Sequence, residues 1–102
     1  MKVLLTGGTG FLGKAVARAL DRRSHELRVL ARTRSDRRGL PPGVEWAEGD
    51  VTDAVSMSRA AHGCDAVVHL AALVKMWVPE REQFHAVNVG GLRNALAAAR
   101  EA

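Results

Sequence analysis

Residues 1–14, MKVLLTGGTGFLGK, decide the fold of this chain. A short apolar stretch, residues 3–5, runs into a glycine-rich turn that leads straight into an amphipathic segment. Gly7, Gly10 and Gly13 have the spacing G-x-x-G-x-x-G, and glycine permits both a tight turn and a close approach of the backbone to a phosphate. A helix that follows directly would point its free N–H groups and its positive dipole end at that anion. The stretch therefore predicts a strand–turn–helix unit that binds the pyrophosphate of a dinucleotide.

The first helix is expected from about Gly10 to Arg23. Its apolar residues recur at helical spacing and form one stripe, which we expect to pack against the sheet. The residues of this stripe are Phe11, Leu12, Val16, Ala19 and Leu20.

The same glycines allow two other interpretations. Residues 8–14 fit the phosphate-binding loop G-x-x-x-x-G-K, but Ala15 follows where the magnesium-ligating Ser or Thr of that loop would stand. Phe11 and Leu12 would also lie inside the phosphate cradle. Both features argue against a nucleoside triphosphatase. The other alternative is a tight strand-to-helix turn that binds no ligand.

The rest of the chain alternates between expected strands and helices. Strands are expected at residues 26–31, 44–48 and 66–70, and a loop at 33–43. A second helix begins at an N-cap, Thr52 or Asp53, and stops at Gly63, and a last helix covers about 80–101. Its apolar stripe comprises Phe84, Val87, Asn88, Leu92, Ala95, Leu96 and Ala99.

This alternation predicts an α/β fold, a doubly wound parallel sheet of about four strands in the order 3-2-1-4. Residues 66–70 are almost continuously apolar, which predicts burial on both faces. In this order they form an edge strand, and such an edge needs a cover. We expect the cover to be a second copy of the chain, a partner or a further C-terminal part, and we expect self-association or marginal stability.

Composition limits the class of protein. A chain of 102 residues with 47% hydrophobic residues indicates one small globular domain, residues 1–102. We expect no membrane span and no signal peptide. The single cysteine, Cys64, excludes an internal disulfide and suits a cytoplasmic location. His25, His62 and His85 show no metal-ligand spacing, so no metal site is expected. His69 is expected to be a packed, hydrogen-bonded residue.

Positive charge is concentrated in one segment. The net charge is +4, and five arginines lie between residues 28 and 38. They are Arg28, Arg32, Arg34, Arg37 and Arg38. A phosphate-bearing small ligand, a nucleic acid or a solvated loop would each explain the cluster. No aromatic residues are interleaved and no nucleic-acid-binding motif is present, which argues against a nucleic-acid partner.

The chain resembles the N-terminal part of the extended short-chain dehydrogenases/reductases, the group of nucleotide-sugar epimerases, dehydratases and dihydroflavonol-reductase-like enzymes. The resemblance covers essentially the whole chain. It rests on four motifs in the expected order, which are TGGTGFLG at residues 6–13, GDVTD at 49–53, HLAA at 69–72 and VNVGG at 87–91. It implies a Rossmann-like fold that is incomplete relative to the full family fold. Ser24 stands where the family commonly has glycine.

The resemblance also implies which residues bind the cofactor. The glycine turn would hold the pyrophosphate, Asp50 and Val51 would lie at the adenine, and Ala71 and Ala72 beside the ribose and nicotinamide. Asp50 could instead be only a turn or capping residue. Asn88 would have a structural role. The complete expected set is Gly7, Thr9, Gly10, Phe11, Leu12, Gly13, Arg32, Arg34, Ser35, Asp50, Val51, Leu70, Ala71 and Ala72.

Arg32 at the end of the second strand bears on the choice of cofactor. Sites for NAD usually have Asp or Glu there, bonding the ribose 2′-hydroxyl. A guanidinium can instead bind a 2′-phosphate through two hydrogen bonds, and Arg34 and Ser35 follow closely. We therefore expect NADP(H) rather than NAD(H). Alternatively, Arg32 points into solvent or stacks on the adenine without distinguishing the cofactors.

The family's catalytic Tyr-x-x-x-Lys pair has no counterpart, because the sequence contains no tyrosine. Lys75, in a loop, is not expected to replace it. We therefore expect no catalytic residue in this chain, which would supply cofactor binding to a reductase or epimerase with its catalytic and substrate part elsewhere. The alternative is a stand-alone nucleotide-binding or sensor module without catalysis.

Overall fold

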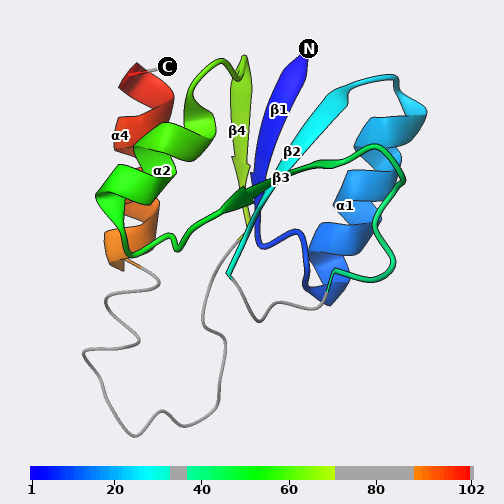
Figure 1. Ribbon diagram of the computed structural model, residues 1–102, viewed down its shortest axis with the longest axis horizontal. Helices are drawn as coiled ribbons and strands as arrows, with labels where there is room; N and C mark the ends of the chain where they lie inside the picture. Colours follow the sequence, from blue (N-terminus) through cyan, green and yellow to red (C-terminus); the bar gives the residue numbers. More distant parts are fainter. Residues whose placement is uncertain (33–36, 71–88, 102) are drawn as a thin grey trace, which may run out of the picture.

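The computed structural model describes residues 1–32, 37–70 and 89–101. They form one parallel four-stranded sheet with helices on both faces (Figure 1). The strands are β1 (Lys2–Thr6), β2 (Glu26–Ala31), β3 (Glu45–Glu48) and β4 (Ala66–His69). The helices are α1 (Phe11–Arg22), α2 (Ala54–Ala61) and α4 (Gly91–Glu101).

The strand order is β3-β2-β1-β4, which confirms the predicted doubly wound topology. In register, Val3 of β1 lies opposite Leu27 of β2 on one side and Ala66 of β4 on the other. All pairs are parallel, so the carboxyl ends of the four strands lie at one edge of the sheet. Ligands bind at this edge in open parallel sheets, where the strand order reverses.

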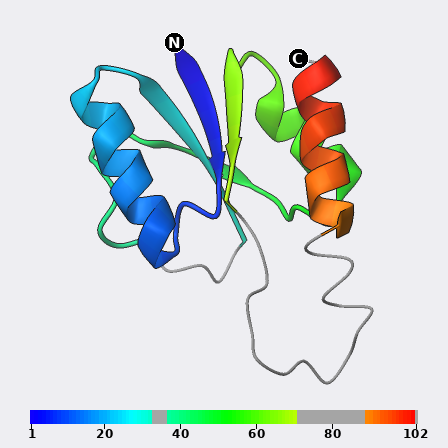
Figure 2. The ribbon, with the colours of Figure 1, turned by 180° about the vertical axis from the view of Figure 1, so that it is seen from behind.

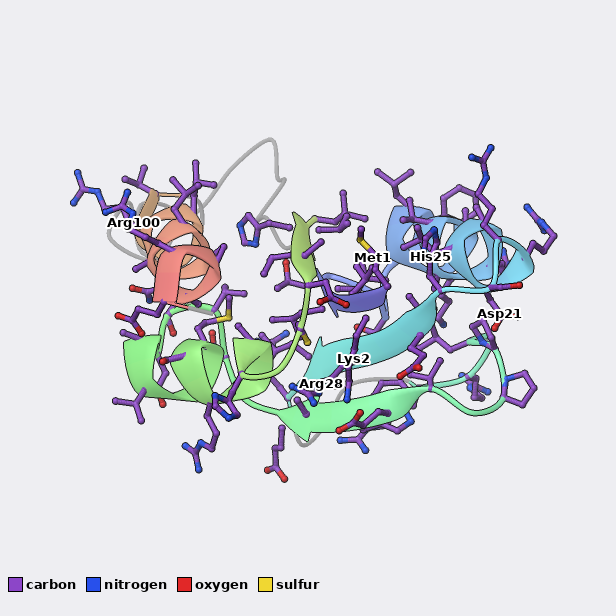
Figure 3. All side chains as sticks on the ribbon, turned by 90° about the horizontal axis from the view of Figure 1, so that it is seen from above. Met1, Lys2, Asp21, His25, Arg28 and Arg100 are labelled. Carbon is purple, nitrogen blue, oxygen red and sulfur yellow. The ribbon has the colours of Figure 1, made fainter. Side chains whose placement is uncertain are left out.

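Alternate residues of the central strands build two separate cores. Leu4 and Leu30 belong to a buried cluster with residues of α2 and α4, whereas Leu5 and Val29 join Ala17 of α1 on the other face. This alternation follows from the two-residue period of a strand. Figures 2 and 3 show α1 on one side of the sheet and α2 with α4 on the other.

The expected packing stripe of α1 is only partly correct. Phe11 is 97% exposed and Leu12 62% exposed, while Gly13 and Ala17 are the buried residues of the helix. Val16 and Leu20 pack partly against the core. The helix approaches the turn so closely that only small residues fit at the contact, and its first residues stand away from the core.

The last helix shows the same deviation. Its buried residues are Gly91, Ala95 and Ala98, whereas Leu92 and Leu96 are exposed. Ala99 is exposed as well, so the expected stripe was wrong at both leucines and at Ala99. Close packing selects small side chains here too, since a Cβ on Gly91 would lie 2.9 Å from Cγ2 of Val51. Residues 80–88, which the sequence assigns to this helix, lie outside the described residues.

Strand β4 is not buried on both faces. All four of its residues are only half-buried, because β4 lies at the edge of the sheet with β1 as its neighbour. The expectation drawn from its apolar run was therefore wrong. The edge position itself was predicted, and a cover for that edge stays a prediction.

Asp53 caps α2, as one of the two predicted N-caps. Its carboxylate accepts hydrogen bonds from the N–H groups of Val55 and Ser56. The helix ends two residues before Gly63, which has φ +81°. Strands β3 and β4 are each one residue shorter than expected, starting at Glu45 and ending at His69 respectively.

Candidate functional site

The glycine turn lies between β1 and α1. Gly7 has φ +73°, in the left-handed region that glycine adopts without strain. Its carbonyl accepts a hydrogen bond of 3.2 Å from the N–H of Gly10. A Cβ on Gly13 would lie 1.9 Å from that carbonyl oxygen, so only glycine permits this approach of helix and turn. The structure thus brings the three glycines together as predicted.

Among the residues that the structure describes, no side chain caps the amino end of α1. Gly10 is the N-cap, and the first turn of the helix contains no acidic residue. In α2, by contrast, the Asp53 carboxylate occupies the corresponding position. The N–H groups and dipole of an uncapped helix end favour an anionic ligand. Half-buried Thr9 and the exposed Phe11 and Leu12 border this end.

Gly8 is a residue that the sequence analysis did not assign to the site. It is buried, and a Cβ there would lie 2.8 Å from Cγ1 of Val29. Glycine at this position lets the turn pack directly on β2. Its place inside the TGGTG run was the available signal, but the G-x-x-G-x-x-G spacing does not include it.

The end of β2 lies beside the turn that follows β3. The N–H of Gly49 donates to the carbonyl of Ala31 at 3.1 Å, so exposed Arg32 leaves the sheet next to Gly49 and Asp50. Two of the expected cofactor residues, Arg32 and Asp50, thus belong to adjacent chain segments at the carboxyl edge. Arg34 and Ser35 lie outside the described residues.

Asp50 shapes its own turn. Its Oδ1 accepts hydrogen bonds from the backbone N–H of Thr52 at 3.0 Å and from the Thr52 hydroxyl at 2.9 Å. This is the turn role that the sequence analysis kept as an alternative. The side chain stays half-exposed, and neighbouring Val51 is buried. Asp50 can therefore hold the turn with one oxygen and still present the other to a ligand.

Two polar residues that the sequence analysis missed fasten this turn. Buried Ser56 donates to the Asp50 carbonyl at 3.1 Å, and its oxygen accepts from the Asp50 N–H at 3.1 Å. Asn94 of α4 donates from Nδ2 to the Val51 carbonyl at 2.8 Å. In the sequence, each of the two appears only as a polar residue within a helical segment, which does not indicate that it supports this turn.

At the carboxyl end of β4, the N–H of Leu70 donates to the Thr6 carbonyl and to Thr6 Oγ1, both at 3.1 Å. His69 is paired with Thr6, which confirms the prediction of a hydrogen-bonded histidine. Burial lowers the pKa of His69. Leu70 thus lies at the expected edge. Ala71, Ala72, Lys75 and Asn88 lie outside the described residues.

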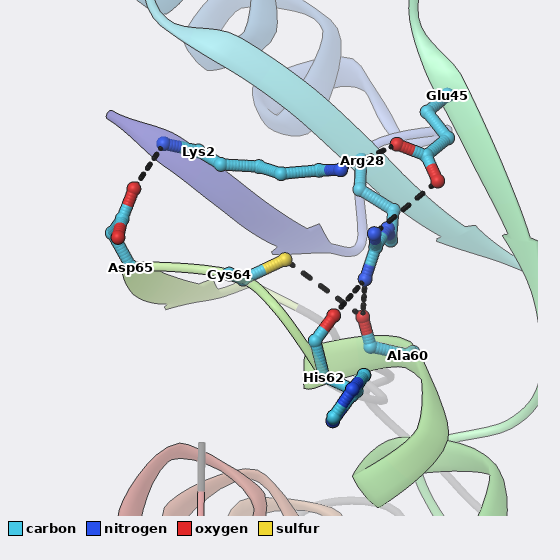
Figure 4. A network of polar contacts seen from close by, with 7 residues as sticks. All are labelled: Lys2, Arg28, Glu45, Ala60, His62, Cys64 and Asp65. Atoms are coloured by element: carbon cyan, nitrogen blue, oxygen red, sulfur yellow. Dashed lines mark hydrogen bonds and ion pairs between the residues drawn. The ribbon is translucent and has the colours of Figure 1, made fainter.

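A second polar cluster lies on the α2 face of the sheet, around Arg28 (Figure 4). Arg28 Nη1 donates to the carbonyls of Ala60 and His62 at 2.6 and 2.7 Å, at the carboxyl end of α2. Its Nη2 forms an ion pair with Glu45 at 3.2 Å. Arg28 therefore binds the carboxyl end of α2, a structural role that differs from the one expected of the arginines nearer the candidate site. Cys64, beside this cluster, is buried, and burial raises its pKa.

The described residues contain no group of three His, Cys, Asp or Glu side chains suited to a metal ion. Within the same residues, no helix has the length and apolar character needed to cross a membrane.

Comparison with known proteins gives the family. Residues 3–102 match the model of the NAD-dependent epimerase/dehydratase family. The chain belongs to this family. The match confirms the resemblance drawn from the four motifs, and the glycine turn and the GDVTD turn of this family member lie at the same edge of the sheet.

Relatives are similar over nearly the whole chain. A 2-alkyl-3-oxoalkanoate reductase of Stenotrophomonas maltophilia is 42% identical over 98% of the chain. A 3 beta-hydroxysteroid dehydrogenase/Delta 5-->4-isomerase of Mycobacterium tuberculosis is 38% identical over 99% of it. The crystal structure of a UDP-glucose 4-epimerase of Thermus thermophilus in complex with NAD superposes with a TM-score of 0.85 at 32% identity, covering 99% of the chain. The chain spans only 30%, 29% and 34% of these three proteins.

Proposed function

We propose that this chain binds a nicotinamide dinucleotide, NADP(H) in preference to NAD(H), within an oxidoreductase or epimerase-like enzyme. The observation that carries the proposal is the glycine turn against the uncapped end of α1. A Cβ at Gly13 would collide with the Gly7 carbonyl, so glycine lets the turn pack directly against the helix end whose N–H groups would bind the phosphates. The similar Thermus epimerase, crystallised with NAD, supports a dinucleotide as that ligand.

The described residues at the carboxyl edge of the sheet support a ligand of this kind. The N-terminus of α1 would bind the pyrophosphate, with the Thr9 hydroxyl as a further donor. The turn of Asp50 and Val51 would hold the adenine, since buried Val51 offers an apolar contact and the half-exposed Asp50 carboxylate an acceptor. Leu70 would lie beside the nicotinamide half, with Ala71 and Ala72 next in sequence.

The preference for NADP(H) is proposed from Arg32. It follows β2 directly, where NAD-binding sites of this fold usually carry a carboxylate for the ribose 2′-hydroxyl. Arg32 is exposed and carries a charge opposite to that of a 2′-phosphate. Arg34 and Ser35 would add two more donors. Replacing Arg32 with alanine should therefore remove the preference without removing binding.

When bound, the cofactor would supply a hydride acceptor or donor for a carbonyl or alcohol carbon. The residues of this chain would bind the dinucleotide and orient it, and residues elsewhere in the enzyme would handle the protons. The reductase and dehydrogenase names of the relatives support this reaction class.

Gly10→Ala tests the location of the pyrophosphate. Among the described residues the new Cβ would meet only the Gly7 carbonyl oxygen, at 3.5 Å, which is ordinary contact, and φ is −81°. The fold should therefore survive while the methyl group blocks the approach of a phosphate. Calorimetric titration with NADPH should show clearly weaker binding. Gly90→Ala is the matched control, because a Cβ there meets no atom of residues 1–32, 37–70 or 89–101 within 4 Å. Undiminished binding by Gly10→Ala would contradict the proposed site.

A further inference from the structure

The turn after β3 is bound to α2 and α4, which lie on the same face of the sheet (Figure 2). Ser56 of α2 bonds to both the N–H and the carbonyl of Asp50, each at 3.1 Å. Asn94 of α4 donates from Nδ2 to the carbonyl of Val51 at 2.8 Å. Both polar backbone groups of Asp50 and the carbonyl of Val51 are therefore held by side chains of these helices.

The N–H of Val51 differs from these groups. It forms no hydrogen bond with any atom of residues 1–32, 37–70 or 89–101. The Asp50 carbonyl and the Val51 N–H belong to one trans peptide group, so they point in opposite directions. Since Ser56 binds that carbonyl, the N–H of Val51 points away from Ser56. The turn thus presents a backbone donor on the side that the helix does not hold.

An acceptor belongs to the same turn. Thr52 donates both its N–H and its hydroxyl to Oδ1 of Asp50, whereas Oδ2 accepts no hydrogen bond from the described part of the chain. The turn therefore offers one donor, the Val51 N–H, and one acceptor, Asp50 Oδ2, on adjacent residues. Adenine carries the complementary pair, an amino donor beside a ring-nitrogen acceptor. These groups suit the base that the proposed function assigns to this turn.

Asn94 reaches the turn because α4 lies directly against Val51. A Cβ on Gly91, one helical turn before Asn94, would lie 2.9 Å from Cγ2 of Val51. Val51 also shares a buried cluster with Ala95 and Ala98 of α4. Within the described residues, Asn94 is the donor to the Val51 carbonyl, and no backbone N–H replaces it. Loss of the amide would therefore release this side of the turn.

We propose that Asn94 is a positioning residue for recognition of the adenine base. Ser56 fixes the peptide group before Val51 and Asn94 fixes the one after it, so that the Val51 N–H and the Asp50 carboxylate are held in place for the base. Asn94 acts through the turn and not on the base itself. This inference rests on the proposed binding of a nicotinamide dinucleotide. It assigns part of the selection of the cofactor to a residue of α4 that lies outside the four sequence motifs.

The test compares NADPH with its deamino analogue, reduced nicotinamide hypoxanthine dinucleotide phosphate, by calorimetric titration of the full protein. A carbonyl oxygen replaces the adenine amino group in the analogue, so Asp50 Oδ2 loses its donor. Asn94→Leu removes the amide donor at nearly constant volume. Asn94→Ala removes the same donor without added bulk and favours a helix. Arg93→Leu is the matched control, since Arg93 is the exposed neighbour of Asn94 on the same helix.

The parent should bind NADPH about ten-fold more tightly than the analogue. Both Asn94 variants should lower this affinity ratio roughly three-fold or more, mainly through weaker binding of NADPH, and Arg93→Leu should leave the ratio unchanged. A parent-like ratio in the Asn94 variants, an equal loss of affinity for both ligands, or the same change in Arg93→Leu would overturn the positioning role while leaving the dinucleotide site intact. Equal binding of both ligands by the parent would overturn recognition of the base by this turn, and binding of neither would contradict the proposed function itself.

Discussion

The hydroxyl oxygen of Thr6 lies 2.7 Å from Nδ1 of His69, joining the carboxyl ends of two paired strands, β1 and β4. Thr6 is completely buried, and its hydroxyl oxygen already accepts the N–H of Leu70. The donor and acceptor roles of Thr6 Oγ1 and His69 Nδ1 depend on the tautomer of the ring. Burial lowers the pKa of His69, which favours the neutral imidazole at the edge where the cofactor is proposed to bind.

We expect His69 to make stability fall with acid. Burial lowers its pKa in the folded chain below the ordinary 6.5, so the unfolded chain takes up this proton first as pH falls. The stability contributed by neutral His69 is fully present above the unfolded pKa and is lost as pH falls through the folded pKa. His69→Gln does not titrate, so the free energy of unfolding of the parent minus that of the variant should shrink between pH 8 and pH 5. Urea denaturation at both pH values measures this, and a constant difference would contradict it.

Ser24→Gly should stabilise the fold. Ser24 has φ +64° and follows the C-cap of α1. Its N–H bonds to the Asp21 carbonyl and the N–H of His25 to the Leu20 carbonyl, the pattern of a Schellman motif in which glycine is preferred. Because relief of the left-handed strain exceeds the entropy cost of glycine, we expect the free energy of unfolding to rise by about 0.5 kcal/mol. Thermal unfolding measures it, with Ser24→Ala as the control that should show no gain. Equal stability of the glycine and alanine variants would contradict the account.

Arg28→Met should destabilise the fold by about 1–3 kcal/mol, because it removes the guanidinium donor from the carbonyls of Ala60 and His62 and leaves the Ala60 carbonyl only the weak Cys64 thiol among the described donors. Glu45, the other partner of Arg28, has a half-exposed side chain. Glu45→Gln should therefore cost less than about 1 kcal/mol. Chemical denaturation of both variants compares the two ends of the cluster. A larger loss for Glu45→Gln than for Arg28→Met would show that the ion pair, rather than the helix end, matters.

Ser56→Ala should weaken both the fold and the proposed adenine site. The Ser56 oxygen is bonded to the N–H and the carbonyl of Asp50, and its loss leaves the N–H without that acceptor. We expect a destabilisation of about 1–2 kcal/mol and weaker binding of NADPH. Ser58→Ala is the control, since Ser58 on the same helix bonds to exposed Glu101. Unfolding midpoints test the loss of stability, and calorimetric titration tests the weaker binding of NADPH. Binding of NADPH by Ser56→Ala as tight as by the parent would contradict a contact between this turn and the cofactor.

Local patterns in the sequence predicted most of the architecture. The glycine turn, the cap at Asp53 and the alternation of strands and helices could be predicted because each depends on residues that are neighbours in sequence. The alternation then indicated the strand order. Helix faces were harder to predict. The contacts of Gly13 and Gly91 show that helices pack here through small residues, and apolar periodicity gives greater weight to Phe11 and Leu96 than to glycine.

The residues of the candidate site that were not predicted from the sequence escaped for a different reason. Ser56 and Asn94 act on the Asp50–Val51 turn through bonds that depend on how α2 and α4 pack on the sheet. Asn94 is distant from Val51 in sequence, and its amide looks like any polar residue on a helix. Such contacts emerge only when the fold is assembled, whereas the turn that they support was visible in the sequence as GDVTD.

The most direct test of the central claim is calorimetric titration with NADPH and NADH at matched salt, on the parent and on Arg32→Ala. We expect tighter binding of NADPH by the parent. In Arg32→Ala the affinity for NADPH should fall to that for NADH, which itself changes little. Equal binding of both cofactors by the parent, or a preference that survives in Arg32→Ala, would contradict the role given to Arg32, and no binding of either to the folded protein would contradict the dinucleotide site.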